Sequence, residues 1–142
     1  MRRIVDRTFE VRARLETAWK VLADLESWPS WAPHIRSVEK SPPGPLGPDT
    51  RGALVLSTGI RSTFRMTEFV PGRSWIWVGP FLGSEIRYGH EFTPGTGTTR
   101  IRFVVDARGW SLVLVGWLFG RIYRRNLERA IPRLIERIER RG

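Results

Sequence analysis

The sequence contains no cysteine, which excludes disulfide bonds, thiolate catalysis and cysteine-based zinc sites. Its only two histidines, His34 and His90, lie far apart, so the chain lacks the close ligand spacing of a metal site. Glycine-rich phosphate loops and the Gly-x-Ser-x-Gly elbow of serine hydrolases are also absent. We therefore expect neither a metal ion nor another cofactor.

Long hydrophobic runs are absent as well. The longest apolar segment, residues 110–119, has about half the length that a membrane-spanning helix needs. No apolar stretch follows Arg2 and Arg3, so the N-terminus does not read as a secretory signal. We expect a single domain, residues 1–142, located in the cytoplasm, with peripheral attachment to a membrane as an open alternative.

Acidic residues are few relative to basic ones, and the formal net charge is +10, contributed almost wholly by arginine. A basic surface can attract nucleic acid, anionic lipid or acidic ligands. The arginines are scattered, and the aromatic residues lie in apolar runs rather than between arginines on one strand face. Stacking platforms for bases are therefore not evident, and we expect no nucleic-acid partner.

Apolar spacing and turn residues predict a strand, two helices, six more strands and a long terminal helix. The predicted strands are 3–11, 34–39, 51–58, 61–70, 73–79, 84–93 and 98–107, and the two early helices are 15–25 and 27–31. The terminal helix is expected to begin at Arg121 and to bend at Pro132. Hairpin-like breaks between the strands indicate an antiparallel sheet in an α+β domain.

Five segments carry a resemblance to a known family, beginning with a Trp-Pro-Ser-Trp motif directly after the first helix. Along the chain the five are Glu16–Asp24, Trp28–Ile35, Thr67–Gly72, His90–Pro94 with Gly97–Ile101, and Asn126–Ile138. In this order they resemble the SRPBCC (START-like) superfamily, in particular its polyketide cyclase/dehydrase branch. The resemblance implies a helix-grip fold, with a curved antiparallel sheet of about seven strands around a long C-terminal helix and two short helices after the first strand.

The resemblance further implies an internal apolar cavity that binds or transports a hydrophobic small molecule, such as a lipid, a quinone or a polyketide-like compound. Strand parity places a set of apolar and aromatic side chains on the faces that would line it. These candidate ligand-binding residues are Phe64, Met66, Trp75, Trp77, His90, Phe92, Ile101 and Phe103. The alternative is that the same residues fill a hydrophobic core.

The second function that the resemblance allows is a polyketide cyclase or dehydratase acting in the same cavity. The candidate proton-transfer residues are His90, Tyr88 and Glu68. No pair of carboxylates converges in the predicted sheet, which favours binding or transport over catalysis.

The apolar segment Trp110–Phe119 is followed at once by Arg121, Arg124 and Arg125. Aromatic residues beside cations suit the interface of a membrane. The segment could equally cover the mouth of the cavity or contact a second subunit in a homodimer, and the sequence leaves the three interpretations open.

Overall fold

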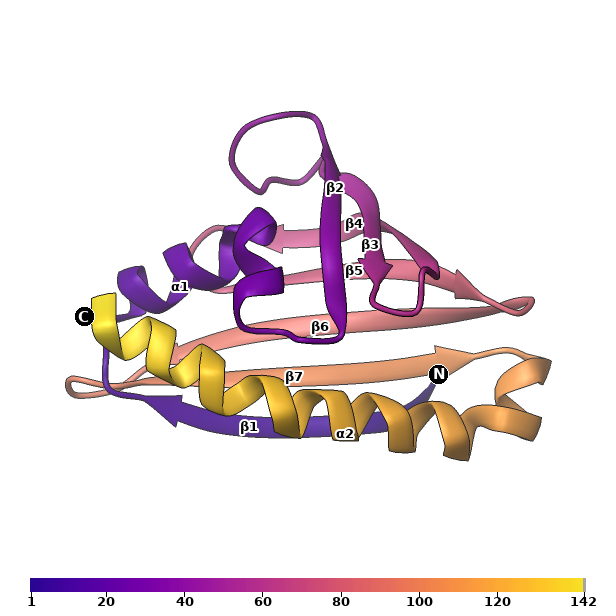
Figure 1. Ribbon diagram of the computed structural model, residues 1–142. Helices are drawn as coiled ribbons and strands as arrows, with labels where there is room; N and C mark the ends of the chain where they lie inside the picture. The colour runs from indigo at the N-terminus through magenta and orange to yellow at the C-terminus, as the bar shows by residue number, and fades with distance from the viewer. Residues whose placement is uncertain (142) are drawn as a thin grey trace.

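The computed structural model describes residues 1–141, which form one sheet and the helices that cover it (Figure 1). The elements are β1 (Arg2–Val11), α1 (Leu15–Ala23), the 3-10 helix η1 (Leu25–Ser30), β2 (Ile35–Ser41), β3 (Arg51–Leu56), β4 (Arg61–Val70), β5 (Ser74–Phe81), β6 (Ser84–Pro94), β7 (Thr99–Arg108) and α2 (Trp110–Arg141). The predicted order of one strand, two short helices, six strands and a terminal helix is confirmed.

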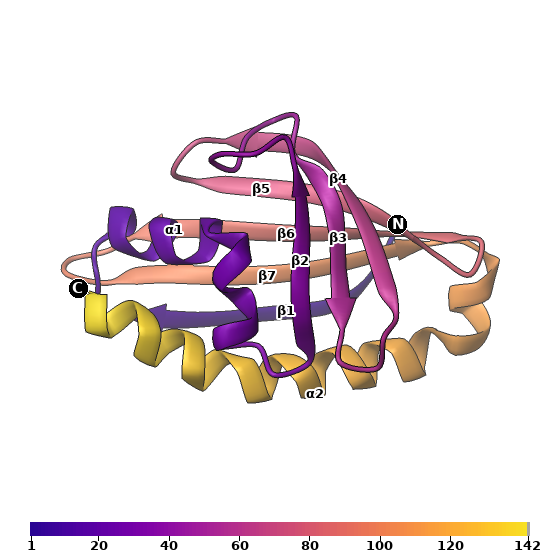
Figure 2. The same ribbon diagram turned by 45° about the horizontal axis from the view of Figure 1, so that its top comes forward.

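The sheet is antiparallel throughout, with strand order β1-β7-β6-β5-β4-β3-β2. It curves strongly, and Figure 2 shows β2 and β3 running across the direction of β6 and β7. The long helix α2 lies along the concave side, and α1 and η1 lie on that side too. This is the helix-grip architecture. We call the face covered by these helices the inner face and the opposite one the outer face.

The Trp-Pro-Ser-Trp motif forms a packed element under α1, as the cost of exposing two indole rings requires. Trp28 and Trp31 are buried, and their ring centroids are 5.3 Å apart. Trp28 Nε1 donates a hydrogen bond to the backbone oxygen of Leu22, 2.8 Å away, which ties η1 to α1. Ser27 lies inside η1 rather than before it, and its hydroxyl donates to the backbone oxygen of Asp24.

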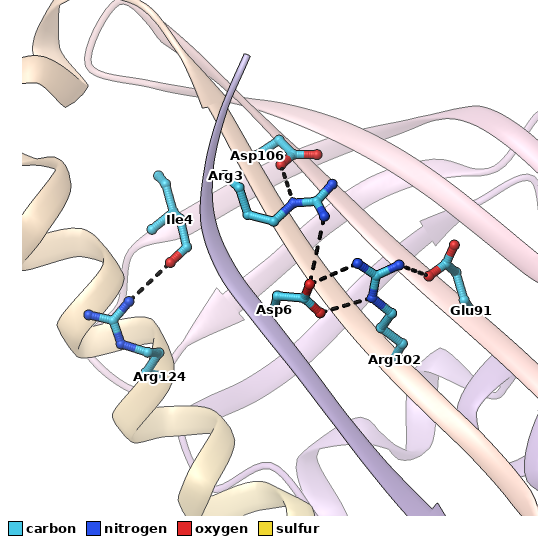
Figure 3. Close-up of polar contacts among 7 residues, drawn as sticks. All are labelled: Arg3, Ile4, Asp6, Glu91, Arg102, Asp106 and Arg124. Carbon is cyan, nitrogen blue, oxygen red and sulfur yellow. Dashed lines mark hydrogen bonds and ion pairs between the residues drawn. The ribbon is translucent and has the colours of Figure 1, made fainter.

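The outer face carries ion pairs instead of a core. Arg102 bridges Asp6 and Glu91, with N–O distances of 2.8 and 3.0 Å, and the Nε of Arg3 lies 3.0 Å from an oxygen of Asp106 (Figure 3). Exposed pairs of this kind stabilise a fold only slightly. Their consequence is that they neutralise the charge of these arginines on the outer face of β1, β7 and β6.

Helix α2 begins eleven residues earlier than the sequence predicts, at Trp110 instead of Arg121. The apolar segment 110–119 is therefore the first part of the terminal helix. Gly120 allows this, because a Cβ there would approach Cγ2 of Ile4 on β1 to 2.6 Å. The helix also runs unbroken through Pro132, which faces solvent.

Candidate functional site

The eight residues predicted to line a cavity all lie on the inner face and are all buried. They pack directly on one another, with ring centroids 4.2 Å apart for Phe64 and Trp77 and 4.5 Å apart for Trp75 and His90. Trp19 of α1 packs against this group from the helix side, with its ring centroid 5.3 Å from that of Trp75. The prediction that these side chains lie on one face of the sheet is thus confirmed, and their role as ligand contacts stays a prediction.

His90 is a core histidine. Its ring stacks on Trp75, and Nδ1 lies 3.4 Å from the backbone oxygen of Trp75, to which it donates in the tautomer that carries its proton there. Burial lowers the pKa of His90 to about 3, because the charged ring would have no water around it. The imidazole is therefore neutral near pH 7 and is not poised for general acid–base chemistry at that pH.

Glu68 does not share the inner face, although simple alternation from Met66 would place it there. Met66 pairs with Trp77 and Glu68 pairs with Ile76, so Thr67 is an extra residue that forms a β-bulge. The bulge reverses the parity of β4 and turns Glu68 outward, where its carboxylate lies 3.3 Å from Arg87. Glu68, one of the candidate proton-transfer residues, therefore does not face the inner site.

Tyr88 lies on the inner face at the other half of β6, opposite the first half of α2. Its ring centroid is 5.9 Å from that of Tyr123 of α2, and these are the only tyrosines of the chain. Burial raises the pKa of Tyr88 to about 12, and its contact with the hydroxyl of Ser62 opposes the shift only in part. Burial also raises the pKa of Tyr123. Both phenols therefore stay protonated and can donate hydrogen bonds.

The two tyrosines belong to a continuous row of aromatic rings. Phe81 of β5 contacts Phe119 of α2 with centroids 5.0 Å apart, and Phe119 stacks near Tyr123 at 6.0 Å. All four rings are only partly buried, in contrast to the closed core under α1. We call Ser62, Phe81, Tyr88, Phe119 and Tyr123 the tyrosine site.

Sequence reasoning proposed Tyr88 but missed the rest of the tyrosine site. Tyr123 could have been found, because it shares the apolar face of the terminal helix, and the resemblance implies that this helix packs against the sheet. Phe119 was missed for another reason, because the segment that contains it was not assigned to the helix.

Two indole N–H groups in the core are unusual. Trp31 Nε1 and Trp75 Nε1 are buried without a hydrogen-bond partner among residues 1–141. Buried donors normally have a partner, since an unpaired N–H costs about 1–3 kcal/mol. Each can therefore serve as a donor to an oxygen atom that enters the inner face.

A surface hollow of about 900 Å³ is lined by residues of the strands β2 to β7. Its walls include Phe64 and none of the other seven predicted ligand-binding residues. Charged residues such as Arg51, Arg61 and Glu85 contribute to its walls, so it differs from the aromatic site that the resemblance implies. No group of three or more His, Asp or Glu side chains within residues 1–141 is arranged to hold a metal ion.

Within residues 1–141, no helix is both long enough and apolar enough to cross a membrane. This includes α2, whose apolar first part gives way to arginines.

The comparisons with known proteins agree with this architecture. A family model described as polyketide cyclase / dehydrase and lipid transport matches residues 2–138. A search of curated proteins found no match.

Solved structures show the same fold at low sequence identity. A START superfamily protein from Mycobacterium smegmatis is 19% identical, with a TM-score of 0.65 and coverage of 96% of this chain and 97% of that one. The protein XoxI from Bacillus cereus is 15% identical, with a TM-score of 0.72 and coverage of 97% and 96%. The hypothetical protein jhp0584 from Helicobacter pylori is 12% identical, with a TM-score of 0.77 and coverage of 92% and 84%.

Proposed function

We propose that this chain, which belongs to the polyketide cyclase / dehydrase and lipid transport family, binds a hydrophobic small molecule at the tyrosine site and carries it. One observation carries the proposal. Four aromatic rings lie in a row on the inner face, they remain partly exposed, and the row includes two phenols that stay protonated. Apolar rings with a few convergent donors are the composition of small-molecule sites.

The chemistry of this site favours a flat apolar molecule with a carbonyl or hydroxyl oxygen, such as a quinone or a polyketide-like aromatic. The rings remove apolar surface from water, which contributes roughly 25 cal/mol per Å². The hydroxyls of Tyr88 and Tyr123 would donate to the oxygen. Trp77 is the cross-strand partner of Tyr88, so the aromatic residues predicted from the sequence adjoin this site.

Binding or transport is favoured over the alternative, a polyketide cyclase or dehydratase. A proton-transferring enzyme needs a group that changes charge near neutral pH. His90 is neutral there, Glu68 faces outward, and Tyr88 keeps its proton. The enzyme alternative therefore has only hydrogen-bond donation from the tyrosines to stabilise a reacting carbonyl. Contact of residues 110–119 with a membrane or a second subunit, and a cytoplasmic location, also remain predictions.

Two matched probes test the proposal. Menadione carries two carbonyl oxygens, and 2-methylnaphthalene has the same ring system without them; the chain has no cysteine that a quinone could alkylate. Binding is measured by the quenching of tryptophan fluorescence and by the shift of thermal unfolding. We expect wild type to bind menadione more tightly than 2-methylnaphthalene.

The double variant Tyr88→Phe, Tyr123→Phe keeps the rings and removes the hydroxyls. It should weaken menadione binding about ten-fold, the effect of about one to two lost hydrogen bonds, and leave 2-methylnaphthalene binding unchanged. Val70→Ser, at the last residue of β4, is the control and should change neither affinity. Equal menadione affinity in wild type and the double variant would contradict the proposed site. If wild type converts a polyketide substrate and the double variant does not, the enzyme alternative is favoured.

A further inference from the structure

The first part of α2 leaves a large apolar surface in water. Trp110 is 68% exposed, Leu114 is 67% exposed and Trp117 is 66% exposed. A soluble domain rarely exposes several large apolar side chains side by side, because each costs free energy in water. We call this surface the α2 patch, and its members are Leu82, Trp110, Val113, Leu114, Trp117 and Leu118.

A second segment contributes to the α2 patch. Leu82, in the turn between β5 and β6, is 68% exposed, and a Cβ at the neighbouring Gly83 would lie 3.2 Å from Nε1 of Trp110. Leu82 has a φ of 47°, which a leucine adopts only at a cost because its Cβ crowds the backbone. The turn therefore holds a leucine in an unfavourable conformation, beside Trp110, with its side chain in solvent.

The same face of α2 becomes cationic one turn further on. Arg121 and Arg125 lie at helical spacing from Leu114, Trp117 and Leu118, so they continue this face, and both are exposed. Within residues 1–141 neither is ion-paired with a carboxylate.

Other nearby arginines behave differently. Arg3 and Arg102 of the sheet are paired with carboxylates, and Arg124 of α2 donates from Nη1 to the backbone oxygen of Ile4 at 3.0 Å, which fastens α2 to β1 (Figure 3). Arg121 and Arg125, by contrast, place charge that no carboxylate within residues 1–141 neutralises directly beside the α2 patch. An apolar face bordered by free cations matches the layering of an anionic membrane, where phosphates lie just above the acyl chains.

We propose that the α2 patch docks the protein on an anionic membrane surface, with Trp117 and its apolar neighbours inserted at the headgroup boundary and Arg121 and Arg125 against lipid phosphates. A dimer through the same patch would bring two chains of net charge +10 into contact, which is electrostatically unfavourable. An anionic membrane instead neutralises them. The proposal does not depend on ligand binding at the tyrosine site.

Vesicle flotation tests the proposal directly. Vesicles of phosphatidylcholine with about a third phosphatidylglycerol are compared with pure phosphatidylcholine at low and high salt. Wild type should float with the anionic vesicles, float far less with the neutral ones, and lose binding as salt rises. Trp117→Ser should weaken binding by about ten-fold or more, and Arg121→Gln by about five-fold.

Two valines give a matched control. Val113→Ser changes an exposed valine of the α2 patch, and Val70→Ser makes the same change at the last residue of β4, beside the start of β5 and away from the patch. Only Val113→Ser should weaken flotation, and circular dichroism should show the wild-type fold in every variant because all four side chains are exposed. Absence of wild-type flotation on anionic vesicles, or equal losses in the two valine variants, would overturn the proposal. The proposal would also be overturned if light scattering showed that wild type is a dimer and that Trp117→Ser is a monomer.

Discussion

Acidification below about pH 6.5 should destabilise the protein through His90. The imidazole has a native pKa of about 3 and an ordinary value of 6.5 when the chain is unfolded. Between these two values the unfolded state binds a proton that the folded state cannot accept. The free energy of unfolding therefore rises with pH across this window and falls as the pH is lowered through it.

The expected magnitude follows from this difference in protonation. Each pH unit inside the window changes stability by about 1.4 kcal/mol for one group. Lowering the pH from 6.5 to 4.5 should thus remove on the order of 2–3 kcal/mol through His90, a large part of the stability of a typical domain. Burial also lowers the pKa of His34, which adds in the same direction. Asp6, whose pKa is lowered by its hydrogen bond from Arg102, contributes stability that is lost only as the pH falls below the ordinary value of 3.8, outside the range from 7 to 4.5.

Urea unfolding at a series of pH values between 7 and 4.5 measures this effect. The variant His90→Phe keeps an aromatic ring on Trp75 and removes the titrating group. Its stability can be lower at pH 7, but its slope against pH should be smaller than that of wild type by about 1.4 kcal/mol per unit in the centre of the window. Equal slopes in the two proteins would refute the assignment of His90 as a buried, neutral histidine.

Three further substitutions test local features of the fold by urea unfolding. Gly52→Ala should destabilise by roughly 3 kcal/mol, because its Cβ would overlap the backbone oxygen of Glu39; a neutral result would contradict the close approach of β2 and β3. Leu134→Ala should cost about 3 kcal/mol, since Leu134 is fully buried where α2 meets the sheet; a cost below about 1 kcal/mol would contradict that packing. Leu82→Asn should stabilise by up to about 1 kcal/mol, because asparagine tolerates a positive φ, while it weakens vesicle binding; a loss of stability would contradict the strained turn.

Most of the fold could be predicted from local patterns. Alternation of side chains identifies a strand whenever one face is buried, and Trp75 and Trp77 of β5 show that pattern clearly. The Trp-Pro-Ser-Trp segment could be predicted to pack because indole rings are too large to leave in water. The family resemblance supplied what alternation cannot, namely that the terminal helix lies in the concave side of the sheet.

The start of α2 could not be predicted, because the usual signal of an amphipathic helix is reversed there. Trp110, Leu114 and Trp117 put apolar side chains on the solvent side, so the segment shows no polar face. Gly116 and Gly120 lower the helix propensity further. The β-bulge of β4 could not be predicted either, because the extra residue is Thr67 and no glycine or proline marks it.

The binding of a hydrophobic molecule on the inner face is the central claim, and native mass spectrometry tests it most directly. Wild type and the variant Tyr88→Phe, Tyr123→Phe are purified in parallel, weighed under native conditions, and extracted with organic solvent for identification of the bound compound. We predict that wild type carries one apolar, oxygen-containing molecule per chain and that the double variant carries less of it. A wild-type protein that carries nothing, and that is stabilised by neither lipids, quinones nor aromatic polyketides, would contradict the claim.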